Sequence, residues 1–125
     1  MGYRSNVCVV FYARTPEYYP AIKLFVEENF PALDGDYELF TKTEHPEKLM
    51  LEYRAEDVKW YPGYTMVQRV DDFMNEFEEL FDSEDSKFEG AFEYARIGED
   101  MEDNDRRESQ SADYFLGIDR KFYIA

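Results

Sequence analysis

The sequence predicts an α+β fold, a ferredoxin-like βαββαβ two-layer sandwich with an extra C-terminal strand. Three observations favour it: an apolar, β-branched segment near the start, two amphipathic stretches with helical spacing, and several short segments that alternate apolar and polar residues. In that arrangement two helices on one face of an antiparallel sheet bury both apolar stripes. The length of 125 residues fits a single domain, residues 1–125.

The first strand and helix are predicted from apolar patterning and proline placement. Residues 6–13 are almost continuously apolar and rich in β-branched and aromatic side chains, which is typical of a buried central strand. Thr15 and Pro16 then suit a helix start. Apolar residues recur with helical spacing as far as Phe30, and Pro31 ends this helix of about four turns.

Two alternating segments predict an antiparallel hairpin with one polar face. They cover residues 37–42 and 48–54, with a tight connection at 44–47. The second helix follows, and it has the clearest period in the sequence. Thr65 and Gln68 have the spacing of a capping box at its start. Its apolar stripe consists of Met66, Val70, Phe73, Phe77, Leu80 and Phe81.

The last third of the sequence predicts two strands separated by an acidic loop. Residues 88–98 alternate as a strand does, with a possible bulge at Gly90. Residues 99–112 contain almost no apolar side chains and are expected to form a flexible loop. Residues 114–124 place five apolar side chains on one strand face, which predicts a final strand that extends the sheet or covers its edge.

The charge of the chain excludes several functional classes. Lys and Arg number 14 and Asp and Glu number 29, so the net charge is 14 − 29 = −15. Residues 71–125 hold 18 of the acids and 6 of the bases, a net −12. No basic footprint for nucleic acid is present and no apolar run has the length of a membrane span, so we expect neither direct nucleic-acid binding nor membrane insertion. An aromatic content of 18% argues against a disordered acidic tail.

No catalytic signature stands out, and we expect no enzyme and no cofactor. The only cysteine, Cys8, lies in the apolar first strand and is expected in the core, and the only histidine, His45, is expected in a surface connection. Residues 99–105 are rich in oxygen ligands but lack the glycine and glutamate of a calcium loop. The sequence therefore predicts no metal site, although a small metal-dependent hydrolase remains a minor alternative.

The acidic residues suggest an interaction surface. Acids four residues apart advance about 6 Å along a helix, a step comparable to that between phosphates, so a line of carboxylates can occupy a protein's nucleic-acid groove. The alternative is a solvated face that only keeps the protein soluble. The acidic candidates are Asp72, Glu76, Glu79, Asp82, Glu99, Asp100, Glu102, Asp103 and Asp105.

Two aromatic residues are second candidates for contact with a partner. Trp60 and Tyr64 flank the turn residues Pro62 and Gly63, which present side chains outward when they form an exposed turn. The alternative is that Trp60 packs under the second helix and Tyr64 packs against its start.

Three segments together resemble a group of small uncharacterised proteins of tailed bacteriophages and prophages. They are Met1-Gly-Tyr-Arg-Ser-Asn-Val7, Val58-Lys-Trp-Tyr-Pro-Gly-Tyr64 and Tyr94-Ala-Arg-Ile-Gly-Glu-Asp100. The resemblance covers most of the chain in order, but its motifs are short and carry no functional residues. It implies a phage accessory protein in the cytoplasm of a bacterial host.

Two functional hypotheses follow from these observations. In the first, a non-enzymatic, monomeric or weakly oligomeric protein binds and inhibits a basic host protein that itself binds nucleic acid, as an anti-defence or host-takeover factor and in the manner of a DNA mimic. In the second, a homo-oligomeric or virion-associated module makes contacts through a sheet edge or the aromatic turn, and the acids serve only solubility.

Overall fold

A computed structural model of the protein describes the structure of residues 4–84, 86, 89–100, 103–118 and 121–125. Its strands are β1 (Ser5–Ala13), β2 (Leu33–Asp34), β3 (Tyr37–Glu38), β4 (Thr41–His45), β5 (Met50–Val58), β6 (Gly90–Ile97), β7 (Asn104–Glu108), β8 (Leu116–Ile118) and β9 (Phe122–Ile124). Its helices are α1 (Tyr19–Asn29) and α2 (Thr65–Phe81), with short 3₁₀ turns η1 (Pro16–Tyr18) and η2 (Pro46–Lys48).

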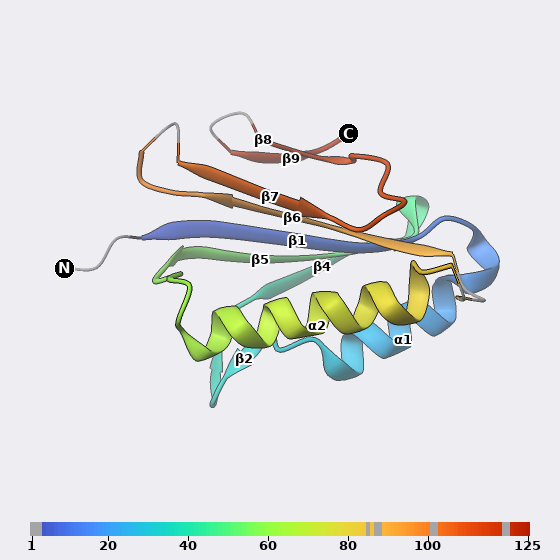
Figure 1. Ribbon diagram of the computed structural model, residues 1–125, viewed down its shortest axis with the longest axis horizontal. Coiled ribbons are helices and arrows are strands. Elements are labelled where there is room, and N and C mark those ends of the chain that lie inside the picture. Colours follow the sequence, from blue (N-terminus) through green and yellow to red (C-terminus); the bar gives the residue numbers. More distant parts are fainter. Residues whose placement is uncertain (1–3, 85, 87–88, 101–102, 119–120) are drawn as a thin grey trace.

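A five-stranded antiparallel sheet organises the fold, in the order β4-β5-β1-β6-β7 (Figure 1). β1 lies at its centre and is buried at every residue except Asn6, as residues 6–13 predict. A strand covered on both faces needs apolar side chains pointing both ways, which explains the continuous apolar run.

The helices α1 and α2 cover one face of the sheet, and aromatic rings fill the space between them (Figure 1). Phe11 of β1 is at the centre of this core, with ring centroids of its neighbours 5.0–6.3 Å away and mostly edge-on or tilted. Those neighbours are Phe30, Tyr53, Phe73, Phe77 and Phe92. The predicted α2 stripe is buried here except for Leu80, which is 44% exposed.

The opposite face of the sheet is covered by the hairpin β8–β9. Leu116 of β8 and Phe122 of β9 pack on a second buried cluster that includes Cys8, Val10 and Tyr12 of β1. This face also carries the buried carboxylate of Glu93. The sheet is therefore covered on both sides in the described part of the chain.

The predicted ferredoxin-like two-layer sandwich is wrong. The structure has a five-stranded sheet with α1 and α2 on one face and the β8–β9 hairpin on the other, so the two-layer description fails. The expected single C-terminal strand over 114–124 is instead two strands that pair with each other rather than with the main sheet. Alternation alone does not show this, because a strand and a short hairpin place apolar residues at the same spacing.

The predicted acidic loop over residues 99–112 is also corrected, because it contains β7. This strand pairs with β6 from Ile97↔Asn104 to Glu93↔Glu108. Its sequence, Asn-Asp-Arg-Arg-Glu, has no apolar alternation, since it is an outer strand whose charged side chains bind neighbouring residues instead of entering a core.

The predicted strand over residues 37–42 is divided in the structure. β3 pairs with β2 through a turn at Gly35, whose φ of +65° favours glycine, while the strand beside β5 is β4. The predicted capping box at the start of α2 is wrong as well. The helix begins at Thr65, and Tyr64 precedes it as an N-cap without a side-chain hydrogen bond.

Gly90 is the first residue of β6 and packs against both helices. A Cβ atom there would lie 2.9 Å from Cδ1 of Ile22 in α1 and 3.0 Å from Cβ of Phe81 in α2. The close approach of the helices to the sheet, rather than a bulge, therefore explains this glycine. Phe88, which the sequence analysis placed in the same strand, lies outside the described residues.

Candidate functional site

The outer side of α2 presents an acidic stripe formed by Asp72, Glu76 and Glu79. All three are exposed, and within the described part of the chain no hydrogen bond or ion pair engages their carboxylates. The helix that carries them is fixed by six buried side chains on its other side. The stripe is therefore a set of solvated negative charges on a rigid support.

Other acids of α2 and its end have partners in the segment around and after β7. Asp71 Oδ1 accepts a hydrogen bond from Arg107 at 2.5 Å, and Glu78 accepts one from the backbone N–H of Gln110 at 2.9 Å. Asp82 accepts from the N–H and hydroxyl of Ser111 at 2.9 and 2.5 Å. Asp82, one of the nine predicted interface acids, instead holds this segment against the end of α2.

The acids Glu99 and Asp100 lie just after β6. Glu99 accepts a hydrogen bond from the backbone N–H of Arg4 at 2.8 Å. Asp100 is exposed, and its carbonyl accepts from the N–H of Asp103 at 3.0 Å. Glu102 lies outside the described residues. The structure thus does not show the nine candidate acids as one continuous surface.

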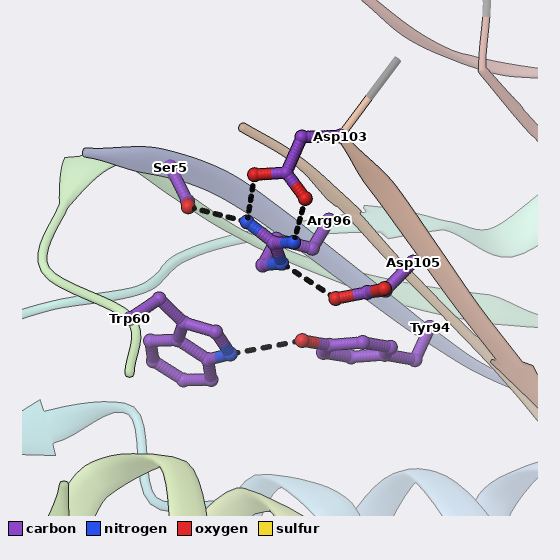
Figure 2. A network of polar contacts seen from close by, with 6 residues as sticks. All are labelled: Ser5, Trp60, Tyr94, Arg96, Asp103 and Asp105. Atoms are coloured by element: carbon purple, nitrogen blue, oxygen red, sulfur yellow. Dashed lines mark hydrogen bonds and ion pairs between the residues drawn. The ribbon is translucent and has the colours of Figure 1, made fainter. Parts of the chain in front are cut away.

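Arg96 of β6 forms ion pairs with Asp103, just before β7, and with Asp105 of β7 (Figure 2). Its Nη2 and Nη1 donate to the two oxygens of Asp103 at 2.6 and 3.3 Å, and its Nε donates to Asp105 at 2.8 Å. Nη1 also donates to the hydroxyl of Ser5 at 2.9 Å. The two carboxylates, Asp103 foremost, hold the pKa of this guanidinium above its usual range.

Trp60 does not point outward as the aromatic hypothesis requires. It is 7% exposed, its ring packs edge-on against Phe40, and its Nε1 donates to the hydroxyl of Tyr94 at 2.8 Å (Figure 2). Burial raises the pKa of Tyr94 to about 12, so its hydroxyl is protonated at neutral pH. Tyr64 is 41% exposed and packs edge-on against Tyr61 at 5.1 Å.

Two adjoining hollows lie between the first half of α2, the segment before it and strands β6 and β7. We call them together the Trp60 groove; they share Trp60, Pro62, Val67 and Tyr94 as walls and measure about 300 and 360 Å³. One hollow reaches Asp71, Met74 and Arg107, and the other reaches Arg96, Asp103 and Asp105.

Sequence reasoning missed the Trp60 groove. Its available signal was the i, i+2 spacing of Tyr94 and Arg96, which places both side chains on one face of β6. This spacing indicates a site only when β7 is known to pair with β6, because β7 supplies Asp105 and Arg107.

The two nucleophile candidates are held in structural roles. Cys8 is fully buried, and burial, with the nearby charge of Glu52, raises the pKa of its thiol to about 12. His45 Nε2 lies 2.7 Å from Oε1 of the buried Glu52. Among the residues that the structure describes, no group of three or more His, Cys, Asp and Glu side chains is placed to hold a metal ion. In the same residues, no helix combines the length and apolar character needed to cross a bilayer.

Comparison of the chain with protein-family models, with curated proteins and with solved structures gave no match.

Proposed function

We propose that this chain is a non-enzymatic, phage-type accessory protein that binds and inhibits a basic, nucleic-acid-binding protein of a bacterial host, in the manner of a DNA mimic. The observation that supports the proposal is the acidic stripe of Asp72, Glu76 and Glu79, whose carboxylates are exposed and have no partner among the described residues. Such carboxylates attract a basic surface without first breaking internal ion pairs.

The distribution of basic residues adds to this support. Arg96 of β6 and Arg107 of β7 are bound to Asp103, Asp105 and Asp71, so they neutralise acids other than the three of the stripe. A chain with net charge −15 creates a negative field that speeds encounter with a positively charged partner.

Self-assembly through a sheet edge is the alternative, because β4 and β7 are the outer strands of the main sheet. Charged side chains such as Lys42, Glu44 and Arg106 occupy these strands, and charge on an outer strand opposes edge-to-edge pairing. The acidic-stripe proposal is therefore preferred, and the mass of the purified protein by light scattering separates the two.

A salt-gradient pull-down from bacterial lysate tests the proposal. The tagged protein is expected to retain one or a few basic nucleic-acid-binding proteins, which elute at moderate salt because exposed charge pairs are screened. Added duplex DNA is expected to release the same proteins. Partners that stay bound through the salt gradient, or retention of no basic protein, would contradict the proposal and favour a contact made through apolar surface.

A further inference from the structure

We propose that the Trp60 groove binds an arginine side chain presented by an extended basic segment of the partner. This inference rests on the proposed function for the identity of the partner, but it concerns a different surface from the acidic stripe. It comes from three properties of the groove: its apolar walls, its internally satisfied cations and one largely exposed carboxylate at its rim.

The walls suit the aliphatic part of a long side chain. Val67 and Pro62 line both hollows, and the rings of Trp60 and Tyr94 form the wall on the sheet side. The Trp60 N–H donates to the Tyr94 hydroxyl at 2.8 Å, so the indole offers the groove its ring surface and no free donor. Long basic side chains bury their stems along apolar surface of this kind while the charged end stays near the rim.

The charges of the groove favour a cation and disfavour an anion. Asp71, Asp103 and Asp105 carry three negative charges against the two positive charges of Arg96 and Arg107, which gives 2 − 3 = −1. All three nitrogens of Arg96 donate to Ser5, Asp103 or Asp105. The terminal nitrogens of Arg107 donate to Asp71 and Asn75. A phosphate or carboxylate ligand would have to displace these internal partners.

Asp105 is the anchor for the incoming charge. Its side chain is 62% exposed, and its Oδ2 accepts the hydrogen bond from Arg96 Nε, while no donor among the described residues binds its Oδ1. The carboxylate therefore keeps acceptor capacity toward the groove. A guanidinium at this position can donate to Asp105 and lie beside the ring of Tyr94, and both contacts favour a planar cation.

Arginine fits these features better than lysine. Its guanidinium is planar, is less strongly hydrated than an ammonium and stacks on aromatic rings while it donates in the ring plane. Lysine supplies a compact and strongly hydrated charge that gains less from the Tyr94 wall. We therefore expect lysine peptides to bind more weakly than arginine peptides.

The probe for this inference is the blocked tripeptide acetyl-Gly-Arg-Gly-amide, with its lysine and citrulline analogues. Citrulline keeps the shape of arginine and removes its charge. Trp60 is the only tryptophan of the chain, so its indole N–H signal in an NMR spectrum and its fluorescence report directly on the groove. Titrations in about 0.15 M salt suppress nonspecific attraction to a protein of net charge −15.

Three variants locate the binding. Asp105→Asn keeps an oxygen acceptor for Arg96 and removes the anchor's charge, and we expect about tenfold weaker binding of the arginine peptide. Asp36→Asn makes the same charge change at an exposed acid that lines neither hollow, and it is expected to leave this binding unchanged. Val67→Phe fills both hollows without altering charge and is expected to abolish the shift of the Trp60 signal.

Either of two results would overturn the inference. One is binding of the citrulline peptide as tight as that of the arginine peptide. The other is an equal loss of affinity in Asp105→Asn and Asp36→Asn. Neither result bears on the proposed function, whose tests use the acidic stripe and a whole partner protein. A partner that needs the stripe but leaves the Trp60 signal unmoved would overturn the groove inference alone.

Discussion

Replacing Glu93 by alanine is expected to lower the free energy of unfolding by about 3–5 kcal/mol. Its carboxylate is completely buried and accepts hydrogen bonds from the hydroxyl of Tyr12 at 2.7 Å and from the N–H groups of Phe115 and Leu116 at 2.9 Å. Arg106 lies 3.6 Å away and supplies a compensating charge. Alanine leaves these three donors without their acceptor and removes the ion pair with Arg106, so the hairpin β8–β9 loses its polar attachment to the sheet.

Urea unfolding of the variant measures this effect, and hydrogen exchange of the Leu116 amide shows whether the hairpin opens first. Glu93→Gln is expected to cost less, because the amide oxygen still accepts while the charge opposite Arg106 is lost. Glu56→Ala is the matched control, since Glu56 is exposed and its removal should change stability by no more than about 0.5 kcal/mol. A loss below about 1 kcal/mol in Glu93→Ala would mean that the hairpin is held by apolar packing alone.

Reversing the charge of the acidic stripe is expected to abolish binding of the basic partner, a loss of more than about a hundredfold in affinity. The variant carries Asp72→Lys, Glu76→Lys and Glu79→Lys, which changes the net charge from −15 to −15 + 6 = −9. Each lysine faces the cations that the carboxylate attracted, so attraction becomes repulsion at three positions. Calorimetric titration with the purified partner gives the affinity, and circular dichroism confirms the fold.

A second triple variant separates a local surface from overall charge. Glu28→Lys, Glu38→Lys and Glu56→Lys change three exposed acids outside α2 and give the same net charge of −9. This control is expected to slow association slightly and to keep most of the affinity. Equal losses in the two triple variants would show that only the overall charge matters, and binding that survives in the stripe variant would remove α2 from the interface.

The sequence predicts those elements whose apolar pattern follows directly from their own burial. β1 is apolar on both faces because it is covered on both faces, and α2 has a clear helical stripe because one side packs on the aromatic core. Both were predicted nearly to their ends. The apolar pattern of each element requires only that something covers it, whichever element that is. Local sequence is therefore enough to predict both elements.

The elements that the sequence does not predict, β7 and the β8–β9 hairpin, depend on contacts between residues far apart in the chain. β7 is held by ion pairs such as Arg96 with Asp105 and Arg107 with Asp71. Its charged sequence looks like that of a loop until its register with β6 is known. The β8–β9 hairpin left one signal in the sequence: Gly117 lies opposite Tyr123, whose ring occupies the space that a Cβ at this glycine would need. Gly117, inside the alternating segment 114–124, was therefore the signal that this segment folds into a hairpin and not into one strand.

The candidate site shows the same division. The exposed positions of Asp72, Glu76 and Glu79 follow from helical periodicity, which places them away from the buried stripe. The partners of Asp82, Glu99 and Asp103 do not follow from periodicity, because the tertiary fold brings each of these acids next to its partner.

Competition with DNA for the isolated partner tests the central claim most directly. The partner is bound to a fluorescently labelled duplex, and the protein is titrated in at constant salt while anisotropy is recorded. Occupation of the nucleic-acid site by the acidic stripe predicts full release of the duplex, with an inhibition constant equal to the directly measured Kd after correction for competing DNA. A stable ternary complex of partner, duplex and this protein would contradict the account.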